Sequence, residues 1–353
     1  MIESFKYNSL GGRVIFGAGS LRELLPEFER LQLRKALVVS TPEQIDLGRT
    51  IEQLIKGHSI GLFPRATMHT PVSVTEEALA FIMRFDADSI VAVGGGSTIG
   101  LSKAIALRTG LPQIVMPTTY AGSEVTPILG ETQNGIKKTQ RTPKVLPEVV
   151  IYDVNLTVTL PVPLSVTSGL NAIAHAAEAL YARDRNPIIT MLAESGIRSL
   201  AGALPQIFLD PTNIDARSDA QLGAWLCGLC LGGTEMALHH KLCHTLGGTF
   251  NLPHAETHCV ILPHALAYNL PAVPIASEQL ARALGDANPA RYLQTLASQL
   301  AAPISLRELG MQEKDIESAA ELAVENAYWN PRSFSHEDVK AILFRAWSGL
   351  PPE

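Results

Sequence analysis

The hydrophobic pattern of this chain changes at Pro161 and Pro163, and this change limits the folds that the chain can adopt. Before the two prolines, short apolar runs alternate with helical segments. Such runs are typical of strands buried on both faces, and their alternation with helices predicts a mostly parallel sheet that helices cover on both sides. After the prolines, one amphipathic segment follows another without a strand pattern, which predicts helices only.

These patterns give boundaries for the expected elements. The expected strands of the first part are 35–40, 89–93, 114–116 and 149–153. The expected helices of the second part are 165–182, 186–205, 215–238, 256–269, 275–284, 289–301, 313–327 and 335–348. Gly247 and Gly248 predict a turn. Because 353 residues favour two domains, we expect a Rossmann-like α/β nucleotide-binding domain over residues 1–160 and an all-helical catalytic domain over residues 161–353.

Composition excludes several classes of function. The formal net charge of -6 argues against nucleic acid or an anionic membrane surface as a partner. Residues 1–8 lack the apolar core of a signal peptide, and the most apolar window, 224–238, is too short to span a bilayer. Four cysteines without the spacing of a disulfide framework fit a reducing cytoplasm. We interpret Cys227 and Cys230, which lie in an apolar helical segment, as core residues.

A glycine turn between a strand and a helix is the first candidate site. Residues 91–97 read VAVGGGS and precede a helical segment. Three glycines let a phosphate approach the backbone closely, and the helix N-terminus supplies free N–H groups and positive partial charge. The G-x-G-x-x-G fingerprint of a standard Rossmann site is absent. Many tight turns look similar, but this position favours a phosphate site formed by Gly94, Gly95, Gly96 and Ser97.

Polar side chains in two helical segments form the second candidate site. Asn171 and His175 are one helical turn apart and therefore share a face. His240, His244 and His254 follow in the second segment. Any one of these histidines alone would more simply be a core residue. The four together, with i,i+4 spacing, favour a metal-binding or acid/base pocket built from two helical segments.

These segments resemble the iron-type alcohol dehydrogenase family. That family holds a divalent metal with one aspartate and three histidines, in the pattern G-x-D-A-x-x-H-A-x-E, then H-x-x-x-H, then P-H. Here residues 169–178 read GLNAIAHAAE, 240–244 read HKLCH and 253–254 read PH. The likeness runs from about Phe16 to His264 and departs at one decisive position, where Asn171 replaces the aspartate. This asparagine is similar to the maleylacetate reductase branch of the family, as are the segments 117–127, 239–248 and 328–332.

The resemblance implies a dehydroquinate synthase-like fold in which the glycine turn binds the pyrophosphate of NAD(P). It also implies that Thr118 and Thr119 contact the cofactor, and that the loop with Tyr120 shapes the substrate pocket. Cofactor choice is made at the end of the first strand, where an acidic residue would repel a 2′-phosphate. The segment there begins at Ser40 and has no acid until Glu43. We therefore expect both NADH and NADPH to be used, with Ser40 facing the ribose.

Asn171 changes the metal chemistry that the resemblance implies. A neutral amide oxygen is a weaker ligand than a carboxylate, so Fe²⁺ or Zn²⁺ should bind less tightly. We expect that no metal is required and that a protonated imidazole takes over the electrophilic role. A metal, if bound, would use Asn171, His175, His240 and His254, since three histidines suffice in some zinc enzymes.

The implied reaction reduces the carbon–carbon double bond of maleylacetate to 3-oxoadipate, in the degradation of aromatic compounds. Hydride would attack the alkene carbon β to the ketone, and a cation or hydrogen-bond donor would stabilise the charge that develops on the ketone oxygen. The expected catalytic residues are His175, His240, His244 and His254. Within this set, we assign His240 and His254 to the oxygen and His244 to proton delivery.

The two carboxylates of such a substrate need polar or cationic partners. Arg332 is the first candidate, because guanidinium binds carboxylate through two parallel hydrogen bonds, although a surface arginine ending a loop is the simpler interpretation. Tyr120, Tyr328 and Asn171 are the other expected substrate contacts. His239 and His258 are further candidates, for each of which a structural role is favoured.

Two other functions remain open. The first is a metal-dependent alcohol or polyol dehydrogenase of the same superfamily, against which Asn171 argues. The second is a non-catalytic nucleotide-binding protein, against which the histidines argue. Family members are typically dimers, so we expect a homodimer in the cytoplasm that binds a small dicarboxylate.

Overall fold

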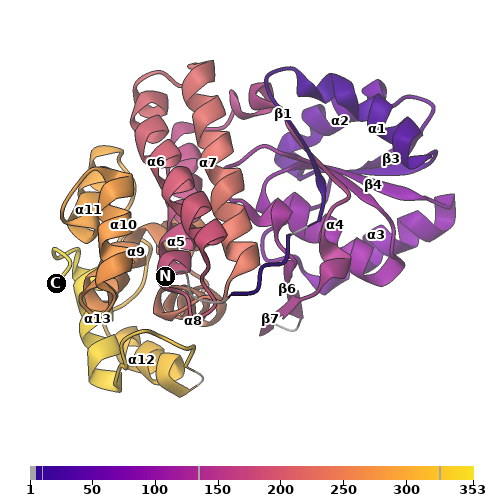
Figure 1. Cartoon of the computed structure of the whole chain (residues 1–353). Helices are drawn as coiled ribbons and strands as arrows, with labels where there is room; N and C mark the ends of the chain where they lie inside the picture. Colours follow the sequence, from indigo (N-terminus) through magenta and orange to yellow (C-terminus); the bar gives the residue numbers. More distant parts are fainter. Residues whose placement is uncertain (1–4, 10, 134–135, 326) are drawn as a thin grey trace. The chain divides into compact units, whose positions relative to one another are not determined.

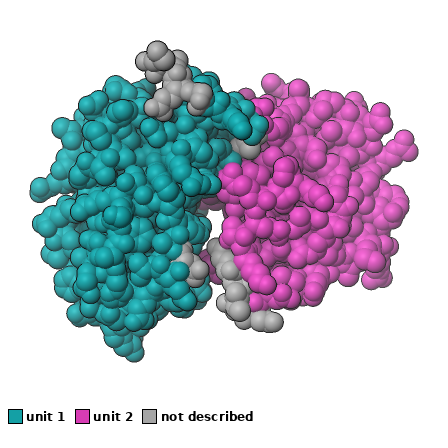
Figure 2. Space-filling view, turned by 60° about the horizontal axis from the view of Figure 1, so that its bottom comes forward, with its two compact units in different colours: residues 1–8, 161–353 teal, residues 9–160 magenta. Residues whose placement is uncertain are grey.

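The computed structural model describes residues 5–9, 11–133, 136–325 and 327–353. Two compact units make up the chain, Ser9–Leu160 and Pro161–Glu353, and Figure 2 colours them separately. The sequence pattern assigns residues 5–8 to the first domain, whereas in the structure they group with the second unit.

The first unit is built on a parallel six-stranded sheet with the strand order β1-β8-β5-β4-β2-β3. Figure 1 labels β1, β3 and β4 of this sheet. Its strands are β1 (Arg13–Phe16), β2 (Ala36–Val39), β3 (Ser59–Phe63), β4 (Ser89–Gly94), β5 (Gln113–Pro117) and β8 (Val149–Tyr152). A separate antiparallel hairpin pairs β6 (Ile128–Gln133) with β7 (Ile136–Arg141). The predicted α/β class is confirmed. The sequence pattern misses β1 and β3, because these are the two edge strands and are only partly buried, so neither shows a continuous apolar run.

Helices cover both faces of this sheet. The helices are α1 (Leu24–Leu31), α2 (Ile45–Leu54), α3 (Val72–Phe85) and α4 (Gly96–Thr109). Successive side chains of β2 point to opposite faces: Val38 packs in one apolar cluster with α1 and α2, and Leu37 packs in another with α3 and α4. The sheet is therefore buried on both sides, and its carboxyl edge carries the loops that lead into the helices.

The described part of the second unit contains helices and connecting turns only, as predicted. The helices are α5 (Val162–Tyr181), α6 (Pro187–Leu209), α7 (Ile214–Gly233), α8 (Leu238–Phe250), α9 (His254–Asn269), α10 (Pro274–Leu284), α11 (Pro289–Gln299), α12 (Asp315–Glu325) and α13 (His336–Ser348). Cys227 and Cys230 are buried on α7, as expected of core residues. Among the described helices, none combines the length and the apolar character needed to cross a membrane.

The turn predicted at Gly247 and Gly248 is wrong. Helix α8 runs through both glycines to Phe250, and the chain leaves the helix at Asn251, whose φ of 54° is left-handed. Asparagine tolerates this conformation better than most residues. Leu242 and Leu246 hold the helix against the apolar core, so tertiary packing outweighs the low helix propensity of the two glycines.

Burial of His264 makes the stability of the helical unit sensitive to acid. His264 lies on α9, and neither of its ring nitrogens has a hydrogen-bond partner among the described residues. Burial, with a smaller effect of the Arg345 charge, lowers the pKa of His264 from 6.5 to about 4. Between these values the unfolded chain binds more protons, so we expect the free energy of unfolding to fall as the pH drops through this window.

The acid sensitivity can be measured by thermal unfolding across the same pH window. We expect His264→Leu to weaken the fall in the unfolding midpoint, because it removes the group that must take up a proton. The partly exposed His336 provides the control, and His336→Gln should keep the full acid sensitivity. Equal pH profiles for His264→Leu and the unchanged protein would contradict the assignment.

Candidate active site

The glycine turn lies at the carboxyl edge of the sheet, between β4 and α4. Gly94 pairs with Pro117 across β4 and β5, and the Thr118 N–H donates to the Gly94 carbonyl over 3.1 Å. This register places the glycine turn, residues 94–97, beside the threonine segment, Thr118 and Thr119, although 20 residues or more separate them in the sequence. The two sets of residues that the sequence suggests for the cofactor therefore lie side by side.

This site leaves room for a phosphate at the start of α4. A Cβ on Gly95 would lie 2.8 Å from the Thr119 Cγ2, whereas a Cβ on Gly96 would meet no atom within 4 Å. Gly96 is exposed and Ser97 is partly exposed at the N-terminus of a 14-residue helix. The free N–H groups of this first turn and the helix dipole favour an anion here, so the residues present fit the pyrophosphate of a dinucleotide.

Two other expected contact residues have buried side chains. Ser40 is fully buried, and its hydroxyl donates to the Thr41 carbonyl oxygen, so Thr41 is the more accessible residue at this strand end. Tyr120 is also fully buried. Thr118 accepts a hydrogen bond of 2.9 Å from the Gln44 side chain, a contact that the sequence pattern did not suggest.

Filling the space at Gly95 should weaken cofactor binding. In Gly95→Ala the new methyl group would overlap Thr119, so the threonine segment must move away from the glycine turn. We expect the Kd for NADH to rise about 10-fold or more, which corresponds to roughly 1.4 kcal/mol of lost binding. Fluorescence titration with NADH measures the change. Gly202→Ala, at an exposed glycine within α6 whose added Cβ would meet no atom within 4 Å, provides the control.

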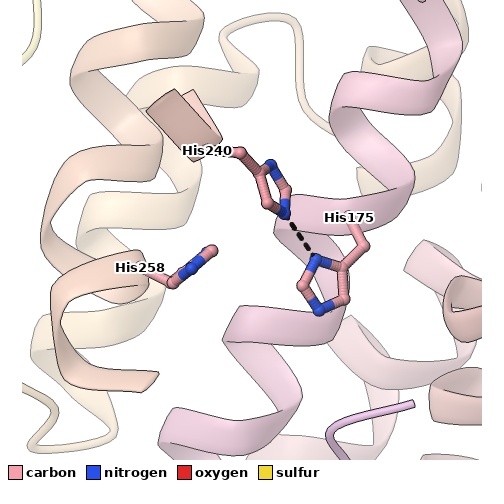
Figure 3. Close-up of side chains that lie close together, drawn as sticks. All are labelled: His175, His240 and His258. Carbon is pink, nitrogen blue, oxygen red and sulfur yellow. Dashed lines mark hydrogen bonds between the residues drawn. The ribbon is translucent and has the colours of Figure 1, made fainter. Parts of the chain in front are cut away.

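The second site is a cluster of imidazoles on three helices of the helical unit. Helix α5 carries Asn171 and His175, α8 carries His240 and α9 carries His258. Nδ1 of His175 and Nε2 of His240 lie 2.8 Å apart, and Figure 3 shows these two rings facing each other with His258 across from them. Ligating nitrogens of all three histidines lie within 4.8 Å of one another.

Glu178 fixes the orientation of His240. One carboxylate oxygen accepts from Nδ1 of His240 over 2.7 Å and from the Ala237 N–H over 2.8 Å. The other oxygen accepts from the His239 N–H over 2.8 Å. Because the carboxylate needs a donor, His240 carries its proton on Nδ1 and directs Nε2 toward His175. The motif 169–178 ends at Glu178 without suggesting a role for it, although its place three residues after His175, on the same helix, indicates a residue near the site.

The remaining histidines extend the cluster. The ring centroids of His254 and His258 lie 4.5 Å apart. Nε2 of His239 and Nδ1 of His258 lie 2.8 Å apart. Burial, and then the charges of the neighbouring histidines, lowers the pKa of both His239 and His258 well below the usual range. These two buried imidazoles are therefore neutral near pH 7.

The expected substrate residues lie in different places. His244 is partly exposed and its Nδ1 lies 3.1 Å from the Tyr328 hydroxyl, so these two residues come together beside the cluster. Arg332 stacks on the Tyr268 ring at 4.0 Å and donates to the Tyr268 carbonyl oxygen over 3.0 Å. The guanidinium is thus engaged by α9, and the structure does not place it against the cluster.

The donor set of the cluster fits a divalent metal. Asn171 Oδ1 and His258 Nε2 are buried and have no hydrogen-bond partner among the described residues. Imidazole nitrogens with an amide oxygen nearby suit Zn²⁺ or Fe²⁺, although the amide lacks the charge of a carboxylate ligand. The trio of His175, His240 and His258 includes a histidine that the sequence pattern did not suggest as a ligand. The predicted ligand His254 lies next to His258 and stays a prediction.

Comparison with known proteins gives consistent results over nearly the whole chain. Residues 11–154 match the pattern of iron-containing alcohol dehydrogenases, and residues 165–347 match the C-terminal pattern of the same family. The chain is 54% identical to a maleylacetate reductase of Sphingobium indicum, over 99% of both chains. It superposes on the crystal structure of maleylacetate reductase from Rhizobium sp. strain MTP-10005 with a TM-score of 0.95 and 51% identity, over 99% of this chain and 100% of that one. An iron-containing alcohol dehydrogenase from Corynebacterium glutamicum gives a TM-score of 0.94 and 39% identity, over 99% of this chain and 98% of the other.

Proposed function

The chain belongs to the iron-containing alcohol dehydrogenase family, and on that basis we propose that it is an oxidoreductase that uses NADH or NADPH to reduce maleylacetate to 3-oxoadipate. The observation that carries this proposal is the identity of about one half, over the full length, to maleylacetate reductases from several species. The glycine turn at the start of α4 supports the cofactor, and the cluster of α5, α8 and α9 supports the chemistry.

The substrate is a ketone conjugated to an alkene, and both ends of the molecule carry a carboxylate. Hydride leaves the nicotinamide and forms a C–H bond at the alkene carbon β to the ketone. The alkene electrons move toward the ketone oxygen as an enolate, and a proton then reaches the carbon next to the ketone. The protein must stabilise the negative oxygen and deliver one proton.

The described residues can divide these tasks. We assign the oxygen to His240 and His254, as expected from the sequence. Because Nδ1 of His240 donates to Glu178, His240 would donate to that oxygen from Nε2, as the protonated imidazole that the sequence predicts. We assign proton delivery to His244, which is partly exposed and which the Tyr328 hydroxyl orients through Nδ1. His175, at 2.8 Å from His240, completes the hydrogen-bonded pair that the substrate oxygen would meet.

We propose further that this reaction requires no metal. The support is chemical: Asn171 offers a neutral oxygen, and reduction of a conjugated alkene forms an enolate rather than an alkoxide. A divalent metal held by His175, His240 and His258 would act as a Lewis acid on the substrate oxygen. That trio of nitrogens favours the second candidate function, a metal-dependent alcohol dehydrogenase of the same family.

Product analysis with isotopically labelled cofactor tests the proposed reaction. NADH carrying deuterium at the transferred position should give 3-oxoadipate with one deuterium on the carbon β to the ketone. Deuterium on the carbon that bears the oxygen would mean that the protein reduces the ketone instead, as an alcohol dehydrogenase does. Use of NADPH, a homodimeric state and a cytoplasmic location stay predictions, which cofactor kinetics, light scattering and cell fractionation can test.

A further inference from the structure

A dicarboxylate substrate brings two negative charges, which need cationic partners beside the histidine cluster. The guanidinium of Arg332 stacks on the Tyr268 ring and donates to the Tyr268 carbonyl oxygen. A second cationic side chain, that of Lys241, lies next to the cluster on α8.

Lys241 lies on α8 between two residues of the cluster. It follows His240 directly, and His244 comes three residues later, so Lys241 and His244 point to the same side of the helix. The ammonium of Lys241 lies 5.8 Å from the centre of the Tyr328 ring, and the hydroxyl of that ring contacts His244. The aromatic ring therefore joins the lysine and the histidine into one group.

We name Lys241, His244 and Tyr328 the α8 rim. Each of the three is at least partly exposed, whereas His240, whose ring lies 6.0 Å from that of His244, is buried. The α8 rim thus places accessible polar groups next to the buried imidazoles. Partial burial lowers the pKa of Lys241, and the charge of Glu325 partly opposes this shift.

We propose that Lys241 determines specificity for dicarboxylates by binding the carboxylate of the substrate that lies farther from the transferred hydride. The Tyr328 hydroxyl donates a hydrogen bond to the same carboxylate. The ammonium forms a charge-assisted hydrogen bond, which stabilises a bound anion more than a neutral donor does. This inference rests on the proposed function and names the residue that selects the substrate class.

The test compares Lys241→Met with Lys241→Arg, on maleylacetate and on its monoester in which the remote carboxylate is masked. Loss of a charge-assisted hydrogen bond is expected to raise the KM for maleylacetate about 10- to 100-fold in Lys241→Met, with kcat changed less than about 3-fold. Lys241→Arg should recover most of this loss. With the monoester, the unchanged protein should already have the raised KM, and Lys241→Met should add little to it.

Several outcomes separate the specificity role from a structural one. The exposed Lys314 provides the control, and Lys314→Met should leave all constants unchanged. A KM that rises equally for diacid and monoester, a fall in kcat alone, or no change would overturn the assignment to Lys241 while leaving the reductase function intact. Absence of maleylacetate turnover in the unchanged protein would overturn the proposed function itself, and the assignment with it. If Lys241→Met does not fold, Lys241→Gln serves as the second neutral variant.

Discussion

Replacing Glu178 by glutamine is expected to lower kcat about 10- to 100-fold, the range found when the partner that orients a metal-binding histidine is lost. The Glu178 carboxylate is fully buried and accepts from Nδ1 of His240 and from the backbone N–H groups of Ala237 and His239. Helix α8 has no side-chain cap of its own, so this carboxylate from α5 also caps its first turn. Glutamine offers one oxygen and an amide group that must face donors, so one N–H is left unpaired.

Steady-state kinetics and thermal unfolding measure this change together. The loss of a buried acceptor is also expected to lower the free energy of unfolding by about 1 to 3 kcal/mol. Glu235→Gln is the matched control, because Glu235 is exposed and pairs with Arg183 on the surface. Kinetics of Glu178→Gln equal to those of the control would mean that the orientation of His240 does not depend on this carboxylate.

Replacing Lys103 by methionine is expected to lower the free energy of unfolding by about 3 kcal/mol or more. Losses of this size are typical when one member of a buried charged pair is removed and the other is left without its partner. Lys103 is buried on α4, and its ammonium donates to the carbonyls of Ser123, Thr126 and Ile128 and to the Thr126 hydroxyl over 2.5 to 3.1 Å. Methionine would leave these oxygens, and the buried Glu124 nearby, without their cation.

The pH dependence gives an independent measurement of the same group. Burial lowers the pKa of Lys103 from 10.5 to about 7, and the Glu124 charge opposes this shift. Between these values the unfolded chain binds more protons, so the lysine makes stability rise with pH across that window. Urea unfolding should show the lower midpoint of Lys103→Met and the loss of this rise. Lys56→Met, at an exposed lysine, is the control. A urea midpoint of Lys103→Met equal to that of Lys56→Met would contradict a stabilising role for the buried Lys103.

The sequence predicts those parts of the fold that local patterns control. Buried central strands and amphipathic helices follow from hydrophobic periodicity, and the glycine turn follows from its place between a strand and a helix. The edge strands β1 and β3 cannot be predicted in this way, because they are only partly buried and therefore lack a continuous apolar run. The turn expected at Gly247 does not form, because packing of α8 against the core outweighs the low helix propensity of glycine.

The active-site cluster depends on tertiary structure in a way that spacing along the chain does not show. The i,i+4 rule places Asn171 with His175, but which rings of α8 and α9 turn inward is decided by how the three helices pack. His258 enters the trio with His175 and His240 for this reason. The contact of Glu178 with residues about 60 positions away likewise exists only after folding. Ser40 directly follows the strand β2, yet its side chain is fully buried.

Consumption of NADH with maleylacetate, measured before and after exhaustive treatment with a chelator, decides whether the reaction needs a metal. We expect turnover that survives removal of metal, because the imidazoles and the cofactor carry the reaction. Turnover that chelation abolishes and one divalent metal restores would contradict the metal-free mechanism and make the cluster a metal site. Absence of turnover in both states, with oxidation of an alcohol in the presence of metal, would contradict the reductase function.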